Sequence, residues 1–267
     1  MTTRYRTIDL KPRPGEMLKP AELIDVRGQS ALTRYARLVY NRLLHNAFGP
    51  EIGENDRSFV IELKEIKGSH SGNERIGDVL TSLQQTIVTV RLSDGRTRQV
   101  QLLGGIDFHD DDRTDGILTY SFDDRLIEIL KESYVFGKLE LRVLSSFDSK
   151  YALALYEAVA RRIRMDSAVE EFTIDEFREL LGVPETKLPR YSDLNAYAIK
   201  PALEEVNALS DFIVTIRPRK RGRKYIGIIM AWGWKDSEAK KEAWAELRRP
   251  RVGRKHRIRQ GNTDAII

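Results

Sequence analysis

The stretch KLPRYSDLNAYAIKPALEEVNALSDFIVTIRPRKRGRKYIGIIMAW, residues 187–232, decides the fold. In its first half apolar residues recur at steps of three and four, which predicts a helix with one stripe on a core. Two runs rich in β-branched residues follow, and Gly222 lies in the cationic turn between them, as a hairpin requires. The order is therefore helix, strand, basic turn, strand. The apolar stripe consists of Leu194, Ala198, Ala202, Val206 and Leu209.

A second stripe of this helix is polar and lies about 120° from the first, at about 100° per residue. It holds Arg190, Asp193, Tyr197 and Lys200, and we expect it to face outward. A helix of this kind followed by a cationic hairpin is the outline of a winged-helix DNA-binding module. The alternative for a basic turn alone is a solvated, charged hairpin tip. The helix before the turn favours the DNA-binding interpretation.

Pro201 lies inside this predicted helix. Proline lacks a backbone N–H and crowds the carbonyl four residues earlier, here that of Tyr197. We therefore expect a kink near Pro201, or two short helices.

The composition excludes several classes of protein. The chain has 267 residues, 41% of them hydrophobic, and no cysteine, which excludes disulfides and thiolate zinc sites. The first residues contain no apolar core of signal-peptide length, and no later run approaches a membrane span. We expect a cytoplasmic protein that needs no cofactor.

The formal charge of +5 is concentrated near the C-terminus. Residues 248–259 hold seven lysines and arginines and no acid, so the rest of the chain is nearly neutral. A concentrated polycation suits a polyanionic partner such as a nucleic acid.

The first half of the chain resembles the second, which indicates an internal repeat. Residues 87–91, IVTVR, match residues 213–217, IVTIR, and each run precedes a Gly-Arg turn. The pair Tyr35 and Tyr40 has the same spacing as Tyr151 and Tyr156. We therefore predict an α+β protein with two tandem winged-helix domains, each a helix-turn-helix followed by a β-hairpin wing. In the first domain we expect helices at 31–48, 63–66 and 76–83 and a hairpin at 87–103.

The predicted division of the chain has four parts. Prolines mark an irregular N-terminal arm, the two winged-helix domains follow, and the C-terminal part is helical and then basic and disordered. Residues 135–144 are predicted to form a strand at the end of the first domain. Loop 69–73 and Asp123 are predicted to cap the helices that follow them, and Thr173 with Glu176 has the spacing of a capping box at the start of a helix at 174–181. The parts are 1–28, 29–145, 146–234 and 235–267.

No catalytic motif is present. The four histidines are scattered, and neither a zinc-protease motif nor a phosphate-binding loop occurs. The acidic loop around His109 is interpreted as solvated, with divalent-cation binding as the alternative. Tyrosine nickases attack DNA through a tyrosine, but they need a metal, commonly held by two histidines one residue apart, and this pair is absent. Tyr35, Tyr40, Tyr151 and Tyr156 are expected to pack into the cores instead, and no enzyme is predicted.

Three segments of the second half, taken together, match a known family. They are SKYALALYE at 149–157, FTI at 172–174 with FRELLGV at 177–183, and KPALEEVN at 200–207. This pattern resembles the replication initiator proteins of theta-replicating, iteron-containing bacterial plasmids. The resemblance extends over about residues 30–232 and is most specific in the second half.

The resemblance implies two tandem winged-helix domains that bind directly repeated sequences at a plasmid origin. It implies that the first domain also serves dimerisation and that the second dominates sequence reading. Monomers would open the origin with host initiator and helicase proteins, whereas dimers would repress the initiator's own gene, all in the bacterial cytoplasm on plasmid or nucleoid DNA. The basic tail is not part of the resemblance.

The candidate DNA-binding residues come from both modules. In the second module the outward helix stripe and the residues before it would enter a major groove, while the wing would bind phosphates or a minor groove. The first module would do the same one turn along the duplex, although Asp78 makes its helix less cationic. A winged-helix transcriptional regulator without initiator activity is the alternative function, and a scaffold protein with incidental charge is another. The candidates are Lys187, Arg190, Tyr191, Tyr197, Lys200, Arg219, Lys220, Arg221, Arg223 and Lys224 in the second module, and Arg75, Ser82, Gln85, Arg96 and Arg98 in the first.

Overall fold

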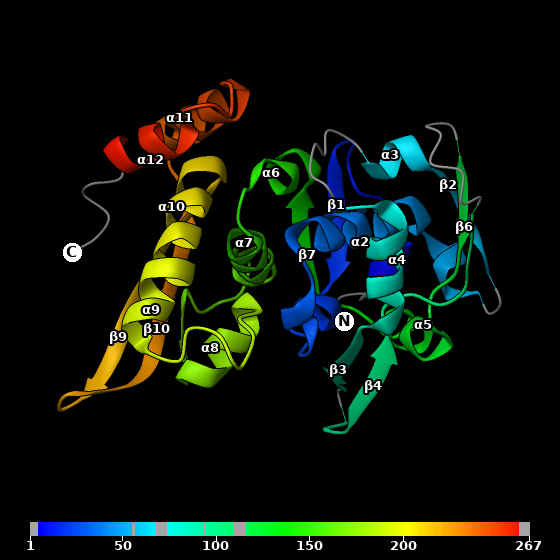
Figure 1. The fold of residues 1–267 in the computed structure, drawn as a ribbon, viewed down its shortest axis with the longest axis horizontal. Coiled ribbons are helices and arrows are strands. Elements are labelled where there is room, and N and C mark those ends of the chain that lie inside the picture. Colours follow the sequence, from blue (N-terminus) through cyan, green and yellow to red (C-terminus); the bar gives the residue numbers. More distant parts are fainter. Residues whose placement is uncertain (1–4, 55–56, 68–73, 93, 109–115, 262–267) are drawn as a thin grey trace. The chain divides into compact units, whose positions relative to one another are not determined.

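The chain folds into two compact units (Figure 1). The first unit comprises Met1–Lys138 and the second Leu139–Ile267, so the division falls before the predicted boundary at residue 145. The reason is local, because the backbone N–H of Glu140 donates a hydrogen bond to the hydroxyl of Tyr156 in the second unit at 3.0 Å. The computed structural model describes residues 5–54, 57–67, 74–92, 94–108 and 116–261.

The first unit contains the three helices and the wing that the sequence predicts, in the predicted order. Helix α2 begins after Thr33, whose side chain accepts a hydrogen bond from the backbone N–H of Ala36. The apolar face of α4, from Ile76 to Leu83, is buried. In the wing, Val88 pairs with Val100 and both are buried. The elements are α2 (Arg34–Ala47), α3 (Leu63–Lys67), α4 (Ile76–Gln85), β3 (Ile87–Arg91) and β4 (Thr97–Gln101).

A second sheet closes the first unit. Strand β6 (Ile117–Tyr120) lies between β2 (Phe59–Glu62) and β5 (Ile106–Phe108). Helix α5 (Asp124–Lys131) follows, capped by the carboxylate of Asp123 as predicted. The acidic loop around His109 lies outside the described residues, as does the predicted capping loop 69–73.

The N-terminal segment is more ordered than the irregular arm that the sequence predicts. It contains β1 (Glu16–Pro20), which pairs with β7 (Phe136–Glu140), and α1 (Ala21–Ile24). The correction has a packing reason, because Ile8, Met17, Leu18 and Leu23 are buried and tie the segment down. Two short 3₁₀ turns accompany it, η1 (Thr7–Asp9) and η2 (Gln29–Ala31), and a third, η3 (Pro50–Gly53), follows α2.

The second unit begins with helices. Residues 141–144 are helical in α6 (Leu141–Ser146) rather than part of the predicted strand. Val143 and Leu144 are buried there, and the hydroxyl of Ser146 donates to the carbonyl of Arg142, four residues back, at 2.8 Å. Helix α7 (Lys150–Arg162) packs against α8 (Ile174–Leu181). The predicted capping box is present: Thr173 caps the backbone N–H of Glu176, and Glu176 reaches back to Thr173.

The predicted recognition helix continues from residue 191 to residue 209. It consists of α9 (Tyr191–Leu194), the π-helical turn η4 (Asn195–Ile199) and α10 (Lys200–Leu209). The predicted kink at Pro201 takes the form of this wide turn, in which the N–H of Lys200 reaches the carbonyl of Asn195, five residues back. The turn thereby precedes the residue that has no N–H to donate.

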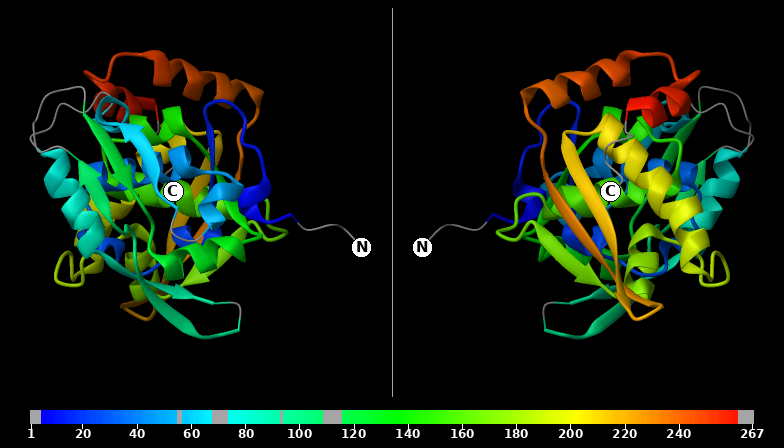
Figure 2. Two further views of the ribbon diagram at one scale, coloured as in Figure 1. Left: turned by 90° about the vertical axis from the view of Figure 1, so that its right-hand side faces the viewer. Right: turned by 90° about the vertical axis from the view of Figure 1, so that its left-hand side faces the viewer.

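The wing of the second unit is a long hairpin. Strand β9 (Phe212–Arg221) pairs with β10 (Lys224–Trp234), and β10 also pairs with β8 (Val169–Phe172). The turn has two residues and places Gly222 at φ 62°, the left-handed region that glycine adopts without strain. The right-hand view of Figure 2 shows this hairpin in orange beside α10 in yellow.

The C-terminal segment is helical further than predicted. Helix α11 (Ser237–Arg248) agrees with the sequence, but the basic run expected to be disordered continues into α12 (Arg254–Gly261). The correction again follows from packing, since Arg254 and Ile258 are buried, one turn apart. Across the described ranges, none of the helices is both long and apolar enough to span a bilayer.

Candidate nucleic-acid interface

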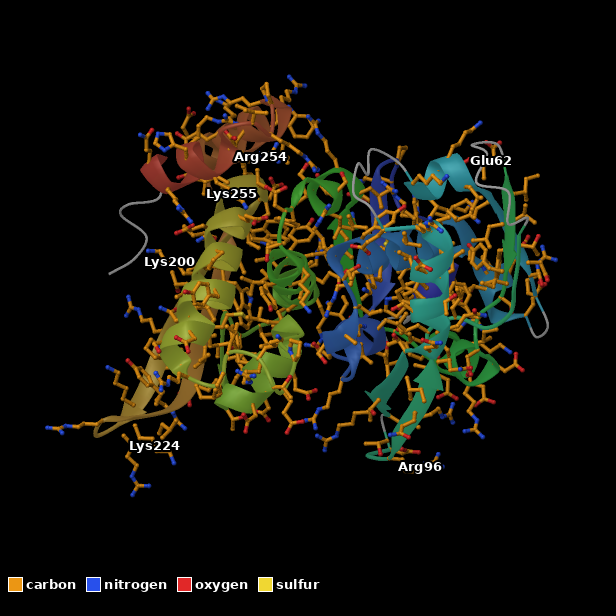
Figure 3. All side chains as sticks on the ribbon, viewed as in Figure 1. Glu62, Arg96, Lys200, Lys224, Arg254 and Lys255 are labelled. Atoms are coloured by element: carbon orange, nitrogen blue, oxygen red, sulfur yellow. The ribbon has the colours of Figure 1, made fainter. Side chains whose placement is uncertain are left out.

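Three of the four residues of the predicted outward stripe are exposed in the second unit, and Asp193 is half-buried. Arg190 is the N-cap residue of α9 and is exposed. Tyr197 is 69% exposed, which is unusual for an aromatic side chain in a helix, and Lys200 is exposed as well. The apolar stripe on the opposite side, from Leu194 to Leu209, is buried against α7 and β9. The helix therefore packs on the unit through its apolar side and exposes its polar side (Figure 3).

The loop before the recognition helix is held by one arginine of α8. The guanidinium of Arg178 donates to the carbonyl of Leu188 at 2.6 Å and to that of Lys187 at 2.5 Å. It also donates to the carbonyls of Pro184 and Glu185, at 3.0 and 3.3 Å. Leu188 has φ 52°, a left-handed conformation that a leucine rarely adopts. Arg178 thus stabilises a strained loop that leads to Arg190 at the start of α9.

An aromatic stack joins the recognition helix to the wing. The rings of Tyr191 on α9 and Tyr225 on β10 lie 4.1 Å apart between centroids, with an interplanar angle of 21°. The ammonium of Lys220 on β9 lies 4.7 Å from the centroid of the Tyr225 ring. Burial raises the pKa of the Tyr191 hydroxyl, so it remains a neutral donor at physiological pH. Helix and wing are therefore one connected surface.

Most cations of this surface have no acidic partner. Arg219 is the exception, since it forms an ion pair with Glu171 of β8 at 3.1 Å. Within the described part of the chain, no ion pair is formed by Lys187, Arg190, Lys200, Lys220, Arg221, Arg223 or Lys224. Unpaired lysines and arginines on a helix and its neighbouring hairpin are available to a phosphate backbone or to base edges.

The candidates of the first unit are differently placed. Arg75, the N-cap residue of α4, and Gln85 at its end are exposed, and Ser82 is half-buried. Arg96 pairs with Asp94 at 2.6 Å across the wing turn, and Arg98 pairs with Glu128 of α5 at 2.7 Å. Both wing arginines are therefore ion-paired.

A hollow of about 480 Å³ lies on the first wing. Arg96 and Arg98 line it together with Arg125 of α5. Sequence analysis missed Arg125, because it lies in a separate helix 27 positions from Arg98, whose guanidinium donates to its carbonyl. The first unit thus gathers three arginines, although acids balance two of them.

Two residues of the second unit were also missed. The sequence places Tyr225 in a strand directly after the cationic turn and Arg178 inside a helix, and neither position alone indicates a functional residue. The register that pairs Tyr225 with Lys220 follows from a two-residue turn at Gly222, so the sequence contained that signal. The contacts of Arg178 depend on the left-handed Leu188, which has no sequence signature.

The tyrosines that were weighed as nucleophiles lie in the cores. Tyr35, Tyr40 and Tyr156 are buried, and Tyr151 is half-buried. The hydroxyl of Tyr156 accepts a hydrogen bond from the backbone N–H of Glu140 at 3.0 Å, and burial raises its pKa. Over the described ranges there is no group of three histidines or carboxylates that could hold a metal ion.

Comparisons with known proteins agree with this architecture. The model of a family described as "Initiator Replication protein, WH1" matches residues 17–160, and that of "Initiator Rep protein, WH2" matches residues 173–232. A replication initiation protein of Escherichia coli is 27% identical over 105 residues, which are 38% of this chain and only 32% of that relative's length.

A solved structure is similar over most of the chain. It is a crystal structure of the Pi initiator protein in complex with iteron DNA, with a TM-score of 0.57 and 16% sequence identity. The similarity covers 84% of this chain and 98% of that one. At this identity the similarity establishes a shared fold, that of two winged-helix domains.

Proposed function

Because this chain belongs to the initiator Rep protein family, we propose that it is a plasmid replication initiator that binds directly repeated origin sequences. Its two winged-helix domains would bind each repeat, promote opening of the origin, and repress the protein's own gene. The DNA complex of the similar Pi initiator protein supports the choice of repeated DNA as ligand.

One observation carries the proposal. The exposed stripe of α9, η4 and α10 and the adjacent wing form a single surface whose cations, except Arg219, lack acidic partners in the described ranges. The stack of Tyr191 on Tyr225 fixes the wing beside the helix. Such a surface matches a recognition helix in a major groove with a wing on the neighbouring backbone.

The two units would contact different parts of each DNA repeat. The second unit would read bases through Arg190 and its neighbours, where arginine can bond bidentately to guanine. The first unit would add Arg75, Ser82, Gln85, Arg96 and Arg98 one turn along the duplex. Two modules a helical turn apart would cover about 20 base pairs.

The proposed partners beyond DNA follow from the family. The first unit would form the dimer that represses transcription, and the monomer would open the origin with host initiator and helicase proteins. The protein would act in the cytoplasm, bound to its plasmid, by binding rather than by cleaving DNA.

The first experiment is a footprint of the purified full chain on DNA flanking its own gene, at two salt concentrations. We expect protection of several regularly spaced direct repeats that persists at the higher salt, because base contacts are retained when phosphate contacts weaken. A matched variant, Arg190→Ala with Lys200→Ala, should lose protection at the end of each repeat that the second unit would read, while keeping the melting temperature, since both side chains are exposed.

Each other footprint has a defined meaning. A single protected palindrome would replace the initiator by a transcriptional regulator. Protection nowhere, with retention on DNA only at low salt, would refute sequence-specific binding altogether and leave a scaffold protein with incidental charge.

The absence of a catalytic step is tested by Tyr156→Phe. The variant should bind DNA as the wild type does and neither protein should nick it, because the hydroxyl is buried and bonded to the backbone rather than open to a phosphate. Incubation with supercoiled plasmid measures nicking. Nicking by the wild type that disappears in the variant would contradict the proposal.

A further inference from the structure

Helix α12 lies outside both matched segments and has two distinct faces. Arg254 and Ile258 are buried on one face, whereas Lys255 and Arg259 are exposed on the other. Each pair is four residues apart, so each forms a line along the helix. No acidic residue occurs in α12, which makes its outer face entirely cationic or neutral.

The helix is anchored by a carboxylate of α11. Glu246 accepts hydrogen bonds from the guanidinium of Arg257 at 2.7 Å and from that of Arg249 at 3.3 Å. Arg254 is the second anchor, because it donates to the carbonyl of Ser146 at 3.0 Å. The cations of the basic run therefore have different roles. Arg254 and Arg257 hold α12 in place, whereas Lys255 and Arg259 are exposed to solvent.

The exposed cations of α12 lie beside acids of the recognition helix. Arg259 lies 3.7 Å from the carboxylate of Glu204 on α10, against which α12 packs. Glu204 follows Lys200 by four residues and so continues the groove-facing stripe. The next residue, Glu205, is buried and accepts hydrogen bonds from the backbone N–H groups of Asp148 and Ser149, so it does not belong to this stripe. Figure 3 labels Lys200 on α10 and Lys255 on α12.

Without α12, the stripe that begins with Arg190 would end in the carboxylate of Glu204, which repels a phosphate backbone. We propose that α12 is a third DNA-contacting element of the second unit: it neutralises this acidic end of the recognition helix and binds backbone phosphates beside the major-groove site through Lys255 and Arg259. The inference rests on the proposed function and extends it to a segment beyond the two winged-helix domains.

The test is the salt dependence of DNA binding by the full chain. Lys255→Gln with Arg259→Gln should lower the slope of log K against log salt by about 1 to 2, because each lost phosphate contact removes about 0.9. The ratio of affinities for repeat and scrambled DNA should stay within about twofold. The control, Lys240→Gln with Lys241→Gln on α11, removes the same charge and should leave the slope unchanged.

A rescue separates the two roles of α12. If Arg259 neutralises Glu204, then Glu204→Gln should restore part of the affinity lost in Arg259→Gln. A wild-type slope in the α12 variant, or an equal loss in the α11 control, would overturn the inference. A wild type that does not prefer repeats over scrambled DNA would instead refute the proposed function, so the two failures are distinguishable.

Discussion

Arg178 shows how one side chain can prepare a site that it does not enter. Its guanidinium contacts four carbonyls between Pro184 and Leu188 and thereby stabilises the left-handed Leu188. Arginine suits this task because it offers five donors in a planar fork, which a lysine ammonium cannot match.

Arg178→Lys should therefore weaken DNA binding without changing any residue of the proposed DNA-binding surface. We expect the free energy of unfolding to fall by about 1.5 to 3 kcal/mol, the range for hydrogen bonds of charged groups. Amide hydrogen exchange at residues 185–190 should accelerate. The control is Arg217→Lys, at an exposed position on β9. It should change neither the free energy of unfolding nor the hydrogen exchange of residues 185–190. Unchanged exchange in Arg178→Lys would show that the loop holds its shape without the guanidinium.

Arg190 and Lys224 allow base reading to be separated from phosphate binding. Arg190→Ala should flatten the preference at one base position, by about 1 to 3 kcal/mol. Lys224→Ala at the wing tip should weaken binding to all sequences equally and reduce the salt slope by about 0.9. Competition binding over single-base variants of the repeat measures both. Indistinguishable profiles would count against a division between helix and wing.

Lys235 caps the C-terminal end of α10. Its ammonium donates to the carbonyl of Ser210 at 2.8 Å and to that of Asn207, carbonyls that the helix leaves unpaired. Burial lowers its pKa from 10.5 to about 8, against the attraction of Asp211 and Glu242. A cap that titrates near neutrality links the stability of the recognition helix to pH.

Between about pH 8 and pH 10.5 the unfolded chain binds a proton that folded Lys235 has released. Raising the pH through this window therefore favours the folded state. We expect the wild type to gain stability relative to Lys235→Met between pH 8 and pH 10, measured by chemical denaturation. Lys241→Gln, which changes an exposed lysine, should show a constant difference from the wild type. If the stability difference between the wild type and Lys235→Met also stayed the same at every pH, folding would not lower the pKa of Lys235.

Local sequence signals predicted most individual elements. Alternation and glycine placed both wings, and the capping box at Thr173 placed the start of α8. Packing decided what these signals could not: β1 and α12 are ordered through buried residues such as Met17 and Ile258, whose partners lie far away in sequence. The turn η4 had a signal, since Leu194, Ala198, Ala202 and Val206 follow at strict four-residue steps. In a regular α-helix such steps drift by about 40° each.

The candidate site was predictable in its cations but not in their pairing. The residues around Gly222 and the outward stripe of the recognition helix follow from periodicity and composition. That Arg98 and Arg219 are paired with Glu128 and Glu171 depends on tertiary structure, because these acids lie in other elements. Sequence therefore overestimates the number of free charges.

At the scale of the whole molecule, two winged-helix units on one chain predict a composite footprint. Arg75→Ala with Gln85→Ala should remove protection from one end of a site of about 20 base pairs, and Arg190→Ala with Lys200→Ala from the other. Hydroxyl-radical footprinting of the full-length variants measures this. Loss of the same positions in both variants would mean that the units do not read separate parts of the repeat.

The wide turn η4 gives the recognition helix one surplus residue. A turn closed by a hydrogen bond five residues back takes up one residue more than an α-helical turn over about the same rotation, so η4 keeps Arg190 in phase with the stripe packed on α7. Deleting Ala196 would therefore restore ordinary α-helical winding and leave Arg190 and Tyr191 in nearly the same direction, whereas deleting a residue of the regular helix α10 would turn them by about 100°. The turn thus acts as a length buffer: at this one place the helix can lose a codon without changing which side chains face outward.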